Sequence, residues 1–294
     1  MKELVSVVIP TYNRKTTICR AIRSVLSQTY NNIEIIVVDD CSKDDTEEVV
    51  NQEFGEDKRV SFYKLDKNSG ACVARNKGVK LSKGKYVAFL DSDDEFIPKK
   101  IELQVEKIQS TGAQLCATDY TIIYRDGSEG VVKTYNGPKE EVFFELLYCN
   151  FITTGTLIGL RECFIETPFD ESQPRYQDWD IVLRLYQKYS FTFLKERTLL
   201  QYYQPVSISA STDHEKTLFA LEVVYERNKA GYNANKRANS QIHWLMGVHG
   251  MFFQEKKYKK NMYIGAISNG INLKRLVILL LSCIGIKKIF SKYL

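Results

Sequence analysis

The chain has 294 residues, of which 44% are hydrophobic and 26% charged, and its formal net charge is +5. This length allows one large α/β domain or one domain with an appendage, and the composition excludes a disordered or fibrous protein. The mild charge gives no ground for nucleic-acid binding, and the interleaved lysines and tyrosines form no nucleic-acid motif.

The spacing of cysteines and histidines argues against several kinds of site. The seven cysteines are scattered without a CxxC pair, and the three histidines form no HxH or HExxH pattern. Neither a zinc site nor a disulfide framework is indicated, so we interpret the cysteines as reduced thiols. The first residues, MKELVSVVIPTYNR, lack the features of a secretory signal. A cytoplasmic protein is therefore expected.

The first ninety residues alternate short apolar runs with segments of helical periodicity. The apolar runs predict strands at residues 5–10, 33–38, 60–65 and 86–90. The periodic segments predict helices at residues 18–26, 45–54 and 71–81, with Asp44 as a candidate cap of the second helix. Strands alternating with helices predict βαβ units and a mostly parallel sheet. Ligands bind such sheets beyond the carboxyl ends of the strands.

The remainder of the chain is less regular. A hairpin around Asp126-Gly127 and two later strands are predicted at residues 114–124, 131–135, 156–160 and 191–203. A helix is expected at 177–189, with one apolar face formed by Trp179, Val182, Leu183 and Tyr186. From about Asp213 onward the pattern is helical. We expect one domain over residues 1–205 and a helical C-terminal region over 206–294.

Four acidic residues follow the apolar run 86–90. Asp91 and Asp93 form a DxD pattern, with Asp94 and Glu95 behind it. Carboxylates this close together at a strand end can hold a hard divalent cation, Mg²⁺ or Mn²⁺, through oxygen. The alternative is a turn in which an aspartate caps a helix that begins near Pro98.

Other polar groups at strand ends are equally open to two interpretations. Asp39 and Asp40 could bond a nucleobase N–H or a ribose hydroxyl, or could cap the helix that follows. Segment 68–78, NSGACVARNKG, is neither a GxGxxG motif nor a P-loop, but its Arg75 could reach a diphosphate. Arg14 offers the same contact, although a surface arginine is usually just solvated.

The combination of motifs is more specific than its parts. SVVIPTYNR, IIVVDDCSKDDT, NSGACVARNKG and YVAFLDSDD, in this order and spacing, resemble glycosyltransferase family 2, which has the α/β GT-A fold. The resemblance extends over about residues 4–205. It implies a Rossmann-like mixed sheet flanked by helices, with the C-terminal helices as an appendage. RYQDWDIVLRL, residues 175–185, resembles the family segment that carries the catalytic base.

The resemblance also implies site residues and a reaction. The implied nucleotide-binding residues are Pro10, Thr11, Tyr12, Arg14, Asp40, Arg75, Asp91, Ser92 and Asp93. Asp93 and Asp94 are the implied ligands of Mn²⁺ or Mg²⁺, and Asp178 is the implied base. The implied enzyme is an inverting, metal-dependent hexosyltransferase. It would take a nucleotide-sugar donor, with UDP favoured, and a saccharide acceptor in bacterial capsule or other cell-surface polysaccharide assembly.

Three departures from the family pattern stand out. Gln177 precedes Asp178, where relatives often have glutamate. No histidine occurs in YYQPVSIS, where relatives often have one after the strand. The QxxRW motif of the membrane-embedded polysaccharide synthases is absent from the sequence, which argues against a processive polymerase.

Physical chemistry is consistent with this reaction. Inverting transfer needs a metal ion that stabilises the departing diphosphate and a base on the opposite face of the sugar. Two separate carboxylate groups are therefore needed, one to hold the metal and one to act as the base. Asp91–Asp94 can supply the first and Asp178 the second. The alternatives are a sugar nucleotidyltransferase, which normally has a glycine-rich N-terminal loop, a receiver-like signalling module, and a non-catalytic membrane scaffold.

The C-terminal stretch 272–294 has an apolar centre with basic flanks. Its apolar core, residues 276–286, is eleven residues long, which is too short to span a bilayer. A basic, apolar helix can lie in an anionic membrane interface, which would suit a lipid-linked acceptor on the inner face of the cell membrane. It can equally pack on the catalytic domain or on a second copy of the chain.

Overall fold

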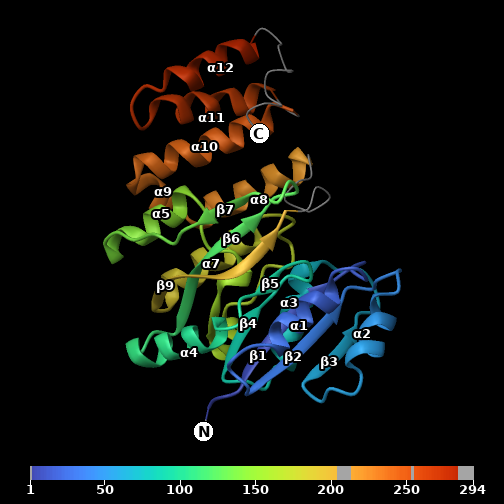
Figure 1. Ribbon diagram of the computed structural model, residues 1–294. Helices are drawn as coiled ribbons and strands as arrows, with labels where there is room; N and C mark the ends of the chain where they lie inside the picture. Colours follow the sequence, from blue (N-terminus) through green and yellow to red (C-terminus); the bar gives the residue numbers. More distant parts are fainter. Residues whose placement is uncertain (1, 204–212, 253–254, 284–294) are drawn as a thin grey trace. The chain divides into compact units, whose positions relative to one another are not determined.

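The computed structural model describes residues 2–203, 213–252 and 255–283 (Figure 1). These residues form two compact units. The first holds most of residues 2–203, and the second comprises 137–150, 173–176 and the described residues from 213 onward. The second unit therefore takes two short segments from within the first two hundred residues. The predicted division between residues 205 and 206 stays a proposal.

One mixed sheet organises the first unit. Among the described residues it has the strand order β3-β2-β1-β4-β8-β6-β9-β5, with β7 paired to β6. The strands are β1 (Val5–Thr11), β2 (Ile33–Asp39), β3 (Val60–Lys64), β4 (Tyr86–Phe89), β5 (Glu95–Phe96), β6 (Leu115–Ile123), β7 (Glu129–Val132), β8 (Ile158–Leu160) and β9 (Phe191–Tyr202). The predicted α/β class with a mixed sheet is confirmed.

Parallel pairing brings the predicted polar strand ends to one edge. β3, β2, β1 and β4 are all parallel, and the register pairs Thr11 at the end of β1 with Asp39 at the end of β2. All seven residues of β1 are buried, as expected for a strand covered on both faces. The chain then reverses, since β8 runs antiparallel to both β4 and β6.

The first unit also contains α-helices, several of which pack on this sheet. They are α1 (Ile18–Leu26), α2 (Thr46–Phe54), α3 (Ala71–Leu81), α4 (Lys100–Thr111), α6 (Arg161–Glu166) and α7 (Gln177–Lys188). Helix α1 buries Ile18, Ile22 and Val25 at helical spacing. Helix α3 lies very close to β1, because a Cβ atom on Gly78 would lie 2.3 Å from Cγ1 of Val8. With valine at position 8, only glycine fits at that crossing.

The structure corrects several sequence-based expectations. Helix α4 begins at Lys100, and its cap residue Lys99 has no side-chain capping bond, so the alternative in which an aspartate caps a helix near Pro98 is wrong. Asp44 does accept a hydrogen bond from the backbone N–H of Thr46, at 3.2 Å. The predicted hairpin forms between β6 and β7, but β7 begins at Glu129. The short elements β5, α5 and α6 were not predicted.

The second unit is helical, as the sequence predicts. Its helices are α5 (Val142–Tyr148), α8 (His214–Arg227), α9 (Lys229–Ala234), α10 (Lys236–Gly250), α11 (Glu255–Ile267) and α12 (Leu273–Cys283). Helices α10 and α11 approach closely at two glycines. A Cβ on Gly247 would lie 2.7 Å from the backbone nitrogen of Met262, and one on Gly265 would lie 2.7 Å from that of Trp244.

Among the described residues, helix α12 packs on its neighbours through one face. Ile278 is buried against Met251 and Met262. Arg275, expected from the sequence to be a basic flank, turns inward and donates to the carbonyl of Gly265 at 2.8 Å. Leu273, Val277 and Leu280 on the same helix are exposed. Among the helices within the described ranges, none combines the length and apolarity needed to cross a membrane.

Candidate active site

The loops after β1 and β2 are held together by hydrogen bonds from backbone N–H groups to side-chain hydroxyls. The N–H of Asn13 donates to Oγ of Ser42 at 2.8 Å, and the N–H of Arg14 donates to Oγ1 of Thr46 at 2.9 Å. Asn13 has φ of +52°, in the left-handed region that asparagine tolerates better than most residues. This geometry fixes the segment that presents Tyr12 and Arg14.

The first predicted nucleotide-binding residues differ in their exposure. Pro10 and Thr11 lie within β1 and are buried, whereas the ring of Tyr12 is exposed beyond the strand end. Nη2 of Arg14 lies 3.6 Å from Oδ2 of Asp93. The first motif is thus brought to the aspartates that follow β4, as the parallel topology requires.

Asp39 and Asp40 form hydrogen bonds with different segments of the chain. Asp39 is fully buried and accepts hydrogen bonds from the N–H and Oγ of Ser42, and burial raises the pKa of its carboxyl. The two oxygens of Asp40 accept from the N–H groups of Ser69 and Gly70, at 2.6 and 2.7 Å. Neither caps α2, so the capping alternative for this pair is wrong. Asp40 instead fixes the loop that leads into α3.

The turn after β4, residues 91–95, crowds three aspartates together. Side-chain exposure is 31% for Asp91 and 17% for Asp93, while Asp94 as a whole is 3% exposed. Ser92 between them is buried. Burial and the neighbouring carboxylates raise the pKa of Asp93, and raise that of Asp94 further. The turn therefore carries a surplus of negative charge that a cation would stabilise.

Two residues that the sequence did not single out support this turn. Nη2 of Arg20, on α1, donates to the carbonyl of Asp93 at 2.5 Å, and its Nε lies 3.1 Å from Oε1 of Glu95. The guanidinium of Arg20 lies 3.9 Å from the ring of Tyr202, whose hydroxyl donates to Glu95 at 2.6 Å. The N–H of Tyr202 donates to Oδ1 of Asp94 at 3.0 Å. No local sequence pattern could have indicated these contacts.

Arg75 on α3 is the buried cation of the site. Its Nη2 donates to Oδ1 of Asp91 at 2.6 Å, and its Nη1 donates to Oε1 of Gln177 at 3.1 Å. Its guanidinium also lies 5.4 Å from the ring of Phe169. Burial is the largest single influence and by itself would lower the pKa of Arg75, but the charge and hydrogen bond of Asp91, together with smaller contributions from Cys72 and Asp178, make the net shift upward. The guanidinium therefore remains charged in the interior.

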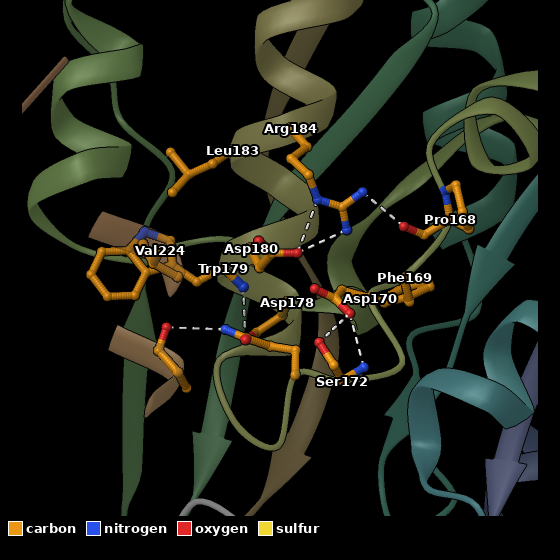
Figure 2. A network of polar contacts seen from close by, with 12 residues as sticks. Pro168, Phe169, Asp170, Ser172, Asp178, Trp179, Asp180, Leu183, Arg184 and Val224 are labelled. Atoms are coloured by element: carbon orange, nitrogen blue, oxygen red, sulfur yellow. Dashed lines mark hydrogen bonds and ion pairs between the residues drawn. The ribbon is translucent and has the colours of Figure 1, made fainter. Parts of the chain in front are cut away.

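Asp178 lies in the first turn of α7, where the sequence predicts it. Its side chain is half-buried, and Oδ1 accepts a hydrogen bond from the N–H of Trp179 at 2.8 Å (Figure 2). Asp180 is buried and forms an ion pair with Arg184 at 2.8 Å, and Arg184 also donates to the carbonyl of Pro168 (Figure 2). Asp180 is thus engaged in a structural contact within α7.

The donor chemistry of the turn fits a divalent cation. Asp91 and Asp93 offer partly exposed carboxylate oxygens, the ligands that Mg²⁺ and Mn²⁺ prefer. Within the part of the chain that the structure describes, no group of three or more histidine, cysteine, aspartate or glutamate side chains is arranged to hold a metal ion without further ligands. A partial site fits this arrangement, because Mg²⁺ usually keeps waters and shares the phosphates of the substrate. The assignment of Asp93 and Asp94 as ligands stays a prediction.

Comparison with known proteins identifies the class. The family model described as Glycosyl transferase family 2 matches residues 6–166, which is more than half of the chain. The chain belongs to this family and is a glycosyltransferase. The nucleotidyltransferase, receiver and non-catalytic scaffold alternatives are thereby excluded.

Two curated relatives carry more specific names. The putative teichuronic acid biosynthesis glycosyltransferase TuaG of Bacillus subtilis (strain 168) is 34% identical over 224 residues, covering 76% of this chain and 88% of that protein. The UDP-Glc:alpha-D-GlcNAc-diphosphoundecaprenol beta-1,3-glucosyltransferase WfaP of Escherichia coli is 39% identical over 157 residues. This match covers 53% of this chain and 60% of that protein.

Solved structures share the fold. The S. aureus TarS 1–349 complex with UDP-GlcNAc matches with a TM-score of 0.62 at 15% identity, covering 96% of this chain and 81% of that chain. The corresponding complex with UDP matches with a TM-score of 0.57 at 18% identity, covering 95% of this chain and 87% of that chain. These matches confirm the predicted GT-A fold, with helices following it.

Proposed function

We propose that this glycosyltransferase acts by inversion and with a divalent metal, moving a hexose from a UDP-sugar to an acceptor hydroxyl in cell-surface polysaccharide assembly. One observation carries the proposal: Arg75 connects the aspartate turn, through Asp91, to Gln177, the neighbour of Asp178. Two carboxylate groups with different surroundings thus lie within one unit. The names of the relatives support surface polysaccharide as the product and UDP as the carrier.

The first carboxylate group binds the donor. Tyr12, Arg14 and Asp40 would line the nucleotide pocket, with Arg14 directed at the aspartate turn. A cation held by Asp93 and Asp94 would offset the negative charge that grows on the diphosphate as it leaves. The contacts of Arg20 and Tyr202 hold the turn in place for that purpose.

The second carboxylate group activates the acceptor. Asp178 would accept the proton of the acceptor hydroxyl as that oxygen attacks the sugar carbon from the face opposite the diphosphate. Its position in the first turn of α7 favours the ionised form, because the helix N-terminus carries partial positive charge. We propose residues 1–205 as the catalytic domain and residues 206–294 as an accessory helical region.

A panel of nucleotide sugars tests the donor assignment. The protein is mixed with Mn²⁺ and UDP-glucose, UDP-N-acetylglucosamine, GDP-mannose or dTDP-rhamnose, and thermal shift and slow donor hydrolysis are measured. A true donor raises the melting temperature by mass action, so the UDP-sugars should stand out. Equal shifts for all four, or a shift for UDP-sugars that is unaffected by chelating the metal, would contradict the proposal.

We also propose that α12 lies on the inner face of the cell membrane, which would bring the enzyme to a lipid-linked acceptor. Leu273, Val277 and Leu280 form an exposed apolar face, and Lys274 beside them is exposed. The sequence continues with Lys287, Lys288 and Lys292, which lie outside the described residues. Apolar and basic groups together suit an anionic lipid surface.

Vesicle flotation tests this surface. The parent should float with phosphatidylglycerol vesicles but not with phosphatidylcholine vesicles, and salt should weaken the binding because it screens charge. Val277→Asp with Leu280→Asp should abolish flotation, whereas Phe219→Asp, at an exposed apolar position on α8, should not. A parent that ignores both vesicles and forms a dimer that Val277→Asp dissociates would show that α12 is a subunit interface.

A further inference from the structure

Arg75 occupies a position in which binding the nucleotide directly would conflict with its other contacts. It is 6% exposed, and its two terminal nitrogens are directed at Asp91 and Gln177. Its third nitrogen, Nε, is buried and has no hydrogen-bond partner among the described residues. A planar guanidinium can bridge two acceptors in this fixed geometry, whereas a lysine ammonium acts as a single point of charge.

The two partners of Arg75 belong to the two halves of the proposed reaction. Asp91 opens the aspartate turn that follows β4, and Gln177 is the first residue of α7. Asp178 is the next residue, so its backbone is fixed wherever Gln177 is fixed. The adjacent Asn76 holds the segment before α7 in the same way, since its side chain exchanges hydrogen bonds with the backbone of Phe169, both at 2.9 Å.

We infer that Arg75 and Gln177 are positioning residues that set the base Asp178 relative to the donor site. This inference rests on the proposed function of Asp178. It differs from the direct nucleotide contact that the sequence predicts for Arg75. The amide of Gln177 suffices because Nη1 needs only an acceptor oxygen there, and Asp91 already neutralises the charge of Arg75. A glutamate at 177 would supply the same acceptor.

Substitutions at 177 separate positioning from a general structural role. Gln177→Met keeps the length of the side chain but removes the acceptor, and Gln177→Glu keeps the acceptor. Gln187→Met, at an exposed position on the same helix, is the matched control. We expect Gln177→Met to lower kcat for hydrolysis of the best UDP-sugar at least about tenfold. Its donor KM and UDP affinity should stay within about threefold of the parent. Gln177→Glu should retain most of the turnover that Gln177→Met loses.

Arg75→Lys provides the second arm, and hydrogen exchange at residues 177–183 provides a readout that needs no turnover. Arg75→Lys should lower kcat with little change in UDP affinity, and both Arg75→Lys and Gln177→Met should speed exchange in the first turn of α7. A tenfold loss of UDP affinity with parent kcat in Arg75→Lys would show direct nucleotide contact and overturn the inference. Equal kcat and equal hydrogen exchange in Gln177→Met and Gln187→Met would also overturn the inference. A parent that neither binds UDP nor hydrolyses a UDP-sugar defeats the proposed function itself, and the inference falls with it.

Discussion

The aspartate edge of the first unit and the packed helices α10–α12 of the second unit are stabilised in opposite ways. At the edge, charged and polar side chains are tied across loops, and the three aspartates of the turn repel one another. In α10–α12, backbones approach at glycines and apolar side chains fill the contact, and the half-buried Arg275 adds polar contacts. The edge is built from crowded charged groups, whereas the contacts between these helices are mainly apolar.

This difference indicates which substitutions should affect activity and which should affect stability. Groups that repel one another in the unliganded protein cost stability but gain a partner when the ligand binds, so their removal should harm activity more than folding. Close helix packing has no such second use. Substitutions at the buried contacts within α10–α12 should therefore act on stability, and substitutions at the edge should act on turnover.

The largest effect is expected for Asp93→Asn. It removes a carboxylate from the turn, so turnover of the UDP-sugar should fall at least about 10³-fold and the Mn²⁺-dependent part of UDP binding should disappear. The melting temperature should stay level or rise, because one repulsive charge is gone. Asp94→Asn should behave alike, and Asp126→Asn, in the exposed hairpin turn, is the control. Metal-independent transfer at parent rates by both variants refutes the assignment.

Asp178→Asn should come next in size. Loss of a general base typically costs 10²–10⁴-fold in rate, so we expect at least about a hundredfold loss in kcat. Asparagine is as good as aspartate near a helix N-terminus, and the melting temperature and UDP affinity should therefore match the parent. Steady-state kinetics beside calorimetric UDP binding check both parts. Near-parent turnover would mean that the base lies elsewhere.

Gly247→Ala tests the other side of the comparison. The added Cβ would meet the backbone of Met262, which cannot move aside as a side-chain end can, so the variant should lose up to about 3 kcal/mol of unfolding free energy. UDP affinity of the folded fraction should not change. Urea unfolding measures the free energy of unfolding, and calorimetric titration measures the UDP affinity. Ala266→Gly serves as a control for loss of packing in α11. A variant as stable as the parent would show that α10 and α11 separate easily.

The smallest effect concerns pH and Lys100, which is fully buried in α4. Its ammonium donates to Gln104 at 2.7 Å, both of its hydrogen-bond partners within the described residues are uncharged, and burial lowers its pKa to about 7. Between that value and the unfolded value of 10.5 the unfolded chain binds the extra proton, so stability rises with pH. From pH 7 to 9 the gain is about 2 kcal/mol. Lys100→Met should lose this rise, and Lys99→Met should keep it, in urea titrations at each pH.

The sequence predicted the parts of the fold whose pattern is local. β1, β2 and β4 are runs of buried apolar residues, α1 and α3 have helical periodicity, and Asp178 was placed correctly because α7 begins beside it. Elements of few residues, such as β5, have too little periodicity to be recognised. Their positions depend on pairing with distant strands.

Contacts between distant residues account for what the sequence could not predict in the site. Arg20 and Glu95 form an ion pair although 75 positions separate them. In the sequence, neither can be told from an ordinary charged surface residue. Arg75 was expected near the phosphates, but its burial follows from how deeply α3 lies in the fold. Asp180, by contrast, pairs with Arg184 one helical turn away, and such a contact can be anticipated from spacing.

The close crossing of α3 and β1 imposes a size constraint that should be visible in sequences. Gly78 leaves no room for a methyl group beside Val8, and Arg75 lies about one turn away on the same helix. A larger residue at 78 must therefore come with a smaller one at 8, or α3 must move outward and carry the guanidinium with it. In a library randomised at both positions, the functional members should be those whose combined side-chain volume stays near that of valine plus glycine.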